Sequence, residues 1–244
     1  MALPGCVTLG DADQPITMET VRAPQPGPES TVVIVLPGFG VDIVEMRERG
    51  IAQAIQSAWP HADVVLANAN FAYYRARTVV QRLHNDVVTP VRAQGYKRVW
   101  LAGASMGGLG ALLYEREHPG LLAGVVLFAP FLGEPPLLKE IRAAGGVQKW
   151  EPGELATELD LRNYQRHLWK RVRAIAEKPE LARRVWLACG TDDFLRSGAQ
   201  LLATALPQSN FIEEPGGHTW KTWTRLTKSV FSRIQTAEAT APAL

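Results

Sequence analysis

Residues 98–108 read Arg-Val-Trp-Leu-Ala-Gly-Ala-Ser-Met-Gly-Gly, and this stretch decides the fold. A short apolar run ends in the pattern G-x-S-x-G, formed by Gly103, Ser105 and Gly107, and an Ala/Leu-rich helical pattern follows at once. A strand, a tight turn and a helix around this pattern raise a serine hydroxyl above the edge of a sheet. The glycines remove Cβ atoms that would collide in so tight a turn. The stretch therefore predicts Ser105 as a nucleophile at the N-terminus of a helix, where free N–H groups favour negative charge.

Apolar, β-branched runs alternate with helical patterns on both sides of this stretch. We expect strands at 16–21, 31–36, 63–66, 98–103, 124–130, 184–190 and 210–213, and helices at 43–59, 78–94 and 220–234 besides the helix after Ser105. Continuous apolar strands are typical of a parallel sheet that is buried on both faces. The alternation predicts an α/β fold, with a mostly parallel central sheet and helices on both faces.

The length of 244 residues suits a single α/β domain spanning 1–244. Residues 131–181 interrupt the alternation and are too long for a plain crossover between strands. We predict that they form a helical cap or lid, inserted over the C-terminal edge of the sheet.

Composition excludes several other classes of protein. Hydrophobic residues make up 46% and charged residues 20%, and the net charge of +2 does not call for nucleic acid or an anionic surface. The two cysteines, Cys6 and Cys189, predict neither a disulfide framework nor a thiolate zinc site. No apolar stretch has the length of a membrane span, and the sequence as written predicts a cytoplasmic protein. Residues 3–6 resemble the end of a lipoprotein signal, so the alternative is a cell-envelope lipoprotein if Cys6 ends a truncated signal.

A nucleophilic serine needs a base, and chain order selects one histidine of the five. In this kind of fold the order along the chain is serine, then an acid, then the histidine. His218 alone follows the late strand at 184–190, after which the acid is expected. It also stands between a short strand and a helix, in the loop 215–218. We therefore expect His218 to be the base.

Two neighbouring aspartates, Asp192 and Asp193, follow the strand at 184–190. One of them can orient the histidine, and the other can cap the next helix, because Asp is favoured at N-caps. Their spacing does not decide between them.

An oxyanion hole requires N–H donors near the nucleophile. The first donor is expected from the residue after the serine, Met106, and the second from the loop 37–40 after an earlier strand. We expect the second donor to be the N–H of Phe39, with Gly40 as the alternative.

Four motifs together resemble the α/β-hydrolase superfamily, most closely its small bacterial serine carboxylesterases of the esterase D-like and feruloyl-esterase-like group. In chain order they are Leu-Pro-Gly-Phe-Gly at 36–40, Gly-Ala-Ser-Met-Gly-Gly at 103–108, Gly-Thr-Asp-Asp-Phe-Leu at 190–195 and Gly-Gly-His-Thr-Trp-Lys-Thr-Trp at 216–223. The resemblance covers about residues 31–234, apart from the insertion. One departure is Pro37-Gly38, where many relatives have His-Gly, and it bears on the hydrogen bonding of that loop.

The resemblance implies a role for each matching position. It implies Ser105 as nucleophile, His218 as base, Asp193 as acid, and the N–H groups of Phe39 and Met106 as oxyanion donors. It leaves Asp192 to the turn or to the start of the next helix, and Trp220 and Trp223 as packing residues behind the histidine.

The expected function is that of a serine carboxylesterase, which hydrolyses short- to medium-chain esters through an acyl-enzyme without a metal or cofactor. Its expected partner is a small-molecule ester. The alternatives are an acyltransferase or thioesterase with the same triad, and a binding protein that has kept the fold without the chemistry.

Overall fold

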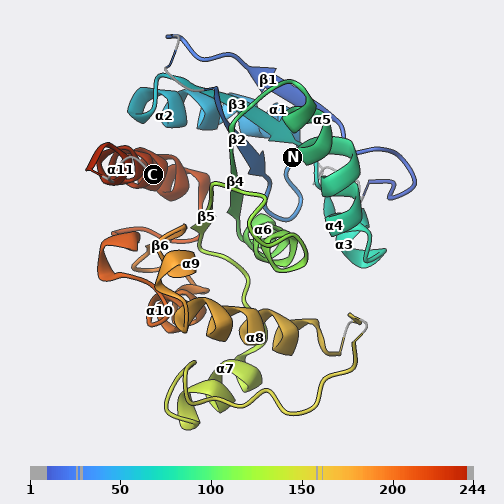
Figure 1. Cartoon of the computed structure of the whole chain (residues 1–244), viewed down its shortest axis with the longest axis vertical. Helices are drawn as coiled ribbons and strands as arrows, with labels where there is room; N and C mark the ends of the chain where they lie inside the picture. Colours follow the sequence, from blue (N-terminus) through green and yellow to red (C-terminus); the bar gives the residue numbers. More distant parts are fainter. Residues whose placement is uncertain (1–9, 26, 28–29, 158, 161, 241–244) are drawn as a thin grey trace, which may run out of the picture.

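The computed structural model describes residues 10–25, 27, 30–157, 159–160 and 162–240 (Figure 1). Cys6 lies outside these residues. Among the described helices, none has both the length and the apolar character needed to cross a bilayer.

Seven strands of the described chain form one sheet in the order β1-β3-β2-β4-β5-β6-β7. Only β1 runs antiparallel to its neighbour β3, and the other pairs are parallel. This confirms the predicted α/β fold with a mostly parallel sheet. The strands are β1 (Met18–Val21), β2 (Thr31–Leu36), β3 (Ala62–Ala67), β4 (Arg98–Ala104), β5 (Gly124–Phe128), β6 (Val185–Gly190) and β7 (Phe211–Glu214).

Side chains alternate between the two faces of the sheet and form two apolar cores. On β2, for example, Ile34 belongs to one core, and Val33 and Val35 belong to the other. Helices α2 (Ile51–Ala58) and α11 (Trp220–Thr240) contribute to the second core and pack against each other.

The remaining helices cover the first core or connect the strands. Figure 1 shows α6 and α8 on the side of the sheet opposite α2 and α11. The remaining helices of the described chain are α1 (Ile43–Glu48), α3 (Phe71–Arg75), α4 (Val79–Arg82), α5 (Thr89–Ala93), α6 (Met106–Glu117), α7 (Pro135–Ala143), α8 (Tyr164–Ala176), α9 (Pro179–Ala182) and α10 (Arg196–Ala203), with a π-helical segment η1 (Leu83–Val88) and a 3-10 helix η2 (Gln208–Asn210).

Two helices expected to be continuous are divided. The helix predicted at 43–59 is α1 followed by α2, because Gly50 takes the left-handed conformation, with a φ of 67°, between them. The helix predicted at 78–94 changes to η1 before Pro90, which has no N–H for the helical hydrogen-bond ladder. The apolar positions that suggested the second helix, Val79, Leu83 and Val87 among them, are nevertheless buried.

Residues 131–181 contain α7, α8 and most of α9. On α8, Leu168, Val172 and Ile175 are fully buried in the first core, so this segment is anchored to the sheet layer. A function of the segment as a cap over the site remains a prediction.

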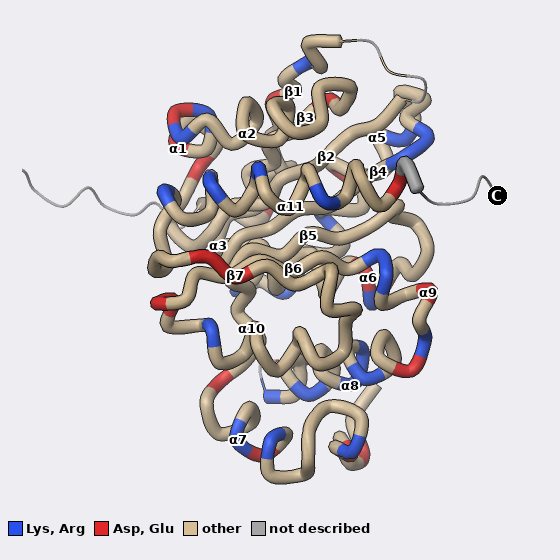
Figure 2. Tube along the Cα trace, turned by 90° about the vertical axis from the view of Figure 1, so that its left-hand side faces the viewer, with Lys and Arg blue, Asp and Glu red and all other residues tan. Residues whose placement is uncertain are grey.

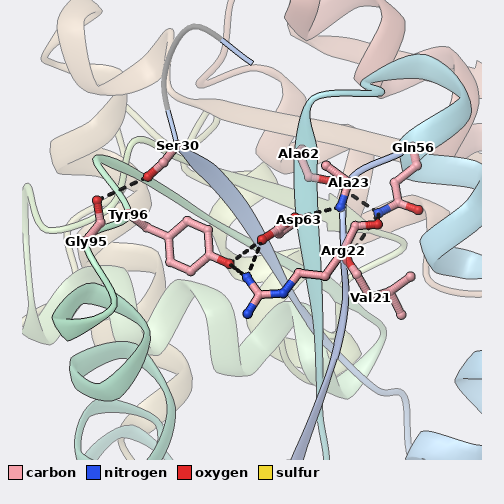
Figure 3. Close-up of polar contacts among 9 residues, drawn as sticks. All are labelled: Val21, Arg22, Ala23, Ser30, Gln56, Ala62, Asp63, Gly95 and Tyr96. Carbon is pink, nitrogen blue, oxygen red and sulfur yellow. Dashed lines mark hydrogen bonds and ion pairs between the residues drawn. The ribbon is translucent and has the colours of Figure 1, made fainter. Parts of the chain in front are cut away.

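A polar cluster ties the N-terminal edge of the sheet together (Figure 3). Asp63 of β3 accepts hydrogen bonds from the Arg22 guanidinium at 2.9 Å, from the Ala23 N–H at 2.6 Å and from the Tyr96 hydroxyl. The Gln56 amide donates to the carbonyl oxygens of Val21, Arg22 and Ala62. These bonds connect β1, α2, β3 and the loop before β4 at the edge opposite the loop that carries Ser105.

Charged residues are spread over the surface rather than gathered in one field (Figure 2). Figure 2 shows basic residues along the outer side of α11 and acidic ones on the neighbouring strand β7. Arg225 of α11 forms an ion pair with Glu214 of β7 at 2.8 Å. The two charge groups therefore partly compensate each other.

Candidate active site

Ser105 lies at the tip of the turn between β4 and α6, with φ 52° and ψ −113°. The turn is possible because the surrounding residues are glycines, and a side chain at these positions would collide with neighbouring backbone atoms. A Cβ atom on Gly103 would lie 2.2 Å from the carbonyl oxygen of Gly107. One on Gly107 would lie 2.6 Å from the carbonyl oxygens of Leu36 and Pro37. The G-x-S-x-G spacing therefore brings the serine turn directly against the end of β2.

The hydroxyl of Ser105 is hydrogen bonded to His218. The distance from Ser105 Oγ to His218 Nε2 is 3.0 Å, and His218 Nδ1 lies 2.9 Å from both carboxylate oxygens of Asp193. The three residues come from the loops after β4, β6 and β7, which end at the same edge of the sheet. The structure thus joins the three sequence-predicted residues in one hydrogen-bonded chain.

Asp193 has a fully buried side chain, and Oδ1 also accepts the N–H of Leu195 at 2.9 Å. A buried carboxylate with these donors is held in one orientation. The neighbouring Asp192 points elsewhere, and its Oδ2 accepts the N–H of Gly216 at 3.3 Å.

Of the two places expected for Asp192, the turn and the start of the next helix, the structure has the turn. The N-cap of α10 is Leu195, and no side chain caps it. Asp192 instead supports the loop before His218, since its N–H also donates to the carbonyl oxygen of Gly216 at 2.9 Å. The carbonyl pairing and the carboxylate bond together connect the loop after β6 to the loop after β7.

Aromatic rings enclose His218. Trp223 meets the imidazole edge to face at 4.8 Å between centroids, and Phe194 lies over it at 4.4 Å. Trp220 packs on Trp223 at 5.2 Å. The two tryptophans therefore pack next to the histidine, as expected, with Trp223 in direct contact with it.

Three of the other four histidines have partners outside this constellation. His84 and His118 stack on each other at 4.1 Å, next to Tyr114. His167 contacts Arg116 and the carbonyl oxygen of Ala156. Selection of His218 by chain order agrees with these positions.

The two expected oxyanion donors lie beside the serine. Met106 is the first residue of α6, so its N–H has no partner within the helix. The loop of Phe39 approaches closely, since a Cβ atom on Gly38 would lie 3.7 Å from Cβ of Ser105. Phe39 and Met106 line the same cavity as Ser105. Their role as donors remains a prediction.

This cavity has a volume of about 550 Å³, within the range of small-molecule sites. Its wall is largely apolar and includes Phe39, Phe71, Leu109, Leu113, Phe131 and Tyr164. Three charged residues, Arg75, Arg77 and Asp160, also line it. The segments around α3 and before α8 thus meet the serine turn at one site.

Sequence reasoning did not find the contribution of α3. Asn70 begins this helix by accepting the N–H of Ala72 at 3.0 Å, which is the one local signal for it. Tyr74 of α3 lines the cavity, and burial raises the pKa of its hydroxyl above the ordinary value. The hydroxyl lies so close to α6 that a Cβ atom on Gly110 would be 2.2 Å from it.

A parallel sheet with a strained serine turn and a hydrogen-bonded histidine at its C-terminal edge defines a serine hydrolase of the α/β-hydrolase fold. Comparison with family models identifies the family. The model described as serine aminopeptidase, S33, matches residues 75–205, more than half of the chain, and the chain belongs to this family. A comparison with curated proteins finds no match.

Several solved structures share the fold at low sequence identity. Est1E from Butyrivibrio proteoclasticus with bound ferulic acid has 15% identity and a TM-score of 0.57, and the match covers 93% of this chain and 96% of that one. S-formylglutathione hydrolase (FrmB) from Staphylococcus aureus has 15% identity and a TM-score of 0.60, covering 89% of this chain and 97% of that one. A thermophilic esterase from Thermogutta terrifontis has 17% identity and a TM-score of 0.55, covering 91% and 93% respectively. The resemblance to feruloyl-esterase-like and esterase D-like proteins is therefore confirmed for the fold.

Proposed function

We propose that the protein is a carboxylesterase that uses Ser105, His218 and Asp193 as a catalytic triad. The observation that carries the proposal is the continuous hydrogen-bonded chain from Ser105 Oγ through His218 to the buried carboxylate of Asp193. In such a chain the imidazole can remove the serine proton while the carboxylate holds the required tautomer.

The reaction would proceed in two halves. Ser105 Oγ attacks the ester carbonyl, His218 takes its proton, and the N–H groups of Phe39 and Met106 stabilise the tetrahedral oxyanion. His218 then gives the proton to the leaving alcohol, and an acyl-serine remains. Water, deprotonated by His218, attacks the acyl-serine. His218 then returns the proton to Ser105 Oγ as the bond between Oγ and the acyl carbon breaks, which releases the acid and the free serine.

Charge at the cavity supports an ester rather than a peptide with a free amino end, although the family description names an aminopeptidase. Such a peptide carries an ammonium group, which requires a carboxylate to hold it. Among the described lining residues, the cationic Arg75 and Arg77 stand against the single carboxylate of Asp160. A neutral or anionic ester therefore fits the cavity better than a cationic substrate.

The substrate range belongs to the same proposal. A cavity of about 550 Å³ must hold both the acyl and the alcohol part of the ester. We expect kcat/KM to be higher for acetyl to hexanoyl esters of 4-nitrophenol than for the palmitoyl ester, with residues 131–181 acting as a partial cap. Strong activation by emulsified long-chain esters would contradict this range.

The test of the nucleophile is Ser105→Ala, assayed on 4-nitrophenyl butyrate. We expect kcat to fall by roughly 10⁵- to 10⁶-fold, because loss of the nucleophile removes the covalent route as a unit. Ser232→Ala, on the exposed side of α11, is the matched control and should retain full activity. A fluorophosphonate probe should label the wild-type and Ser232→Ala proteins but not Ser105→Ala. Retention of a tenth of the wild-type rate by folded Ser105→Ala would refute the mechanism.

A further inference from the structure

Two arginines lie at the C-terminal end of α3, Arg75 as its last residue and Arg77 two residues further along the chain. Arg75 and Arg77 are exposed, and both line the same cavity as Ser105. Within the described part of the chain, neither guanidinium forms a side-chain hydrogen bond or an ion pair. Each therefore has donors available for a ligand, and a guanidinium binds carboxylates in a planar, two-bond geometry.

Arg77 occupies a backbone conformation that favours glycine. Its φ is 63°, and it follows Ala76, the C-cap of α3. Glycine is the usual residue in the left-handed conformation just after a helix, because a side chain there is strained. A long cationic side chain at this position is not explained by the needs of the turn. Strain of this kind concentrates at ligand-binding sites.

Asp160, the carboxylate among the described residues that line the cavity, has other partners. Asp160 accepts the N–H of Arg162 at 2.7 Å and that of Asn163 at 2.8 Å. These backbone bonds hold the pKa of Asp160 below its usual value, and the positive charges of Arg162 and Arg77 add to the effect. Asp160 is thus committed to the turn before α8, and Arg77 attracts it at longer range without a direct ion pair.

The rest of the cavity is suited to an apolar skeleton. Phe71 and Tyr74 of α3 line it, together with Leu109 of α6. Two of the most exposed aromatic side chains in the described chain, Phe39 at 55% and Phe194 at 74%, stand at the same cavity. Apolar walls with two cations at one side fit a ligand that is apolar over most of its length and anionic at one point.

We propose that Arg75 and Arg77 form a subsite for a carboxylate, and that the substrates are apolar esters carrying one free carboxylate. The proposal rests on the proposed esterase function for its catalytic part, while the binding site exists independently of turnover. The carboxylate can belong to the acyl part or to the alcohol part of the ester.

The kinetic test uses matched pairs of esters. For the acyl side these are mono-4-nitrophenyl adipate and its neutral methyl ester. For the alcohol side they are 4-carboxyphenyl butyrate and 4-carbamoylphenyl butyrate. The readout is the ratio of kcat/KM for the anionic member to that for the neutral member. Arg75→Gln/Arg77→Gly should lower this ratio by about ten- to a hundredfold in one pair, the size expected for a lost charged hydrogen bond.

Two controls separate the subsite from general effects. Arg183→Gln removes an exposed arginine at the end of α9 and should leave the ratio unchanged. Arg77→Gly also relieves the strain of the positive φ at residue 77. The Tm of the protein with this substitution should therefore be equal to or above that of the wild type. Such a Tm excludes misfolding as the cause of the lower kcat/KM ratio. An unchanged ratio in both pairs for the double variant would overturn the subsite.

A binding measurement keeps the subsite testable without catalysis. In the Ser105→Ala background, calorimetry should show tighter binding of 4-phenylbutyrate than of 4-phenylbutyramide, and Arg75→Gln/Arg77→Gly should remove most of that difference. If the difference in affinity between 4-phenylbutyrate and 4-phenylbutyramide is the same before and after the substitutions, the subsite is refuted. If the wild type hydrolyses no ester but this preference is present, the esterase function fails and the subsite stands.

Discussion

Ser105 takes a backbone conformation that few residues other than glycine adopt, with a φ of 52°, and the glycines around it allow the chain to hold this turn. Gly107 is the glycine of this turn that lies against the end of β2, where a Cβ atom would meet backbone atoms rather than a side chain that could move. The same contact positions the loop of Phe39 beside the serine. The absence of a side chain at Gly107 therefore allows the nucleophile turn to lie against the loop of the expected oxyanion donor, Phe39.

Substitution of this glycine tests the link. In Gly107→Ala the new methyl group would lie 2.6 Å from the Leu36 and Pro37 carbonyl oxygens, so the loop must shift. We expect a loss of about 1–3 kcal/mol in the free energy of unfolding, as for overpacked cores, together with a large fall in kcat. Urea denaturation and a 4-nitrophenyl butyrate assay measure the two effects.

Gly198→Ala is the matched control for Gly107→Ala. It lies within α10, and a Cβ atom there would make ordinary contacts at 3.5 Å. Alanine should stabilise this helix slightly and leave kcat unchanged. Equal behaviour of the two variants would contradict the close contact at Gly107.

The two aspartates after β6 have different hydrogen-bond partners: Asp193 faces His218, and Asp192 accepts the N–H of Gly216. Asp193→Asn would replace the carboxylate that faces His218 Nδ1 and favour the wrong tautomer, so kcat should fall by up to ~10⁴-fold. Asp192→Asn keeps an oxygen for the N–H of Gly216 and should change kcat by less than about threefold. Steady-state rates of both folded variants are the measurement. A crippled Asp192→Asn beside a nearly normal Asp193→Asn would reverse the assignment.

At the scale of elements, the helix after the serine is held at its far end by a pair of histidines. His118 follows α6, and His84 lies in the π-helical segment η1. Their rings stack at 4.1 Å, and His84 Nδ1 is 3.1 Å from the Tyr114 hydroxyl. Burial lowers the pKa of His118, and the neighbouring His84 lowers it further.

This stack predicts a pH dependence of stability. Because the pKa of His118 is lower in the folded state than in the unfolded state, folding favours the neutral imidazole. The stability that depends on the neutral imidazole is fully present above the pKa of the unfolded state. It is lost as the pH falls through the unfolded and then the folded value. Between pH 7.5 and 5.5, the free energy of unfolding should therefore fall more in the wild type than in His118→Gln. Urea denaturation at both pH values tests this, and equal losses would contradict it.

Over the whole molecule, the two edges of the parallel sheet carry different groups: the candidate catalytic residues lie at one edge and a stabilising polar cluster lies at the other. The C-terminal ends carry Ser105, Asp193 and His218. The N-terminal edge carries the cluster around Asp63 that joins β1 to its neighbours (Figure 3). Burial raises the pKa of Asp63, but hydrogen bonds from Tyr96, Ala23 and Arg22 outweigh it and leave the pKa below its usual value.

Separation of the two edges predicts that stability and activity can be changed independently. Asp63→Asn should lower the free energy of unfolding by about 1–3 kcal/mol at pH 7, since it removes a charged acceptor of several bonds. The kcat on 4-nitrophenyl butyrate should remain within about twofold of the wild type. Because the folded pKa is depressed, the wild type should lose this advantage over Asp63→Asn as the pH falls below about 4. A large loss of kcat in a stable Asp63→Asn would contradict the separation.

The sequence by itself determined the succession of strands along the chain and the position of the serine turn. These features have local causes: apolar runs report buried strands, and the spacing of Gly103 and Gly107 reports a turn without room for side chains. Chain order also selected His218 for the site at which the structure places it. Local patterns were less successful where a break depends on one residue, as at Gly50 and in the segment before Pro90.

The family resemblance implied Asp193 as the acid, but only the tertiary structure shows why Asp193 rather than Asp192 faces the histidine, and only it decided what surrounds the serine. Asp192 and Asp193 are neighbours with the same local signals, and their directions depend on the loop of Gly216, more than twenty residues away. The cavity is built from segments as distant as Arg77 and Tyr164. Periodicity describes which face of an element is buried, but it does not say which elements meet, because that depends on how the layers pack over the sheet.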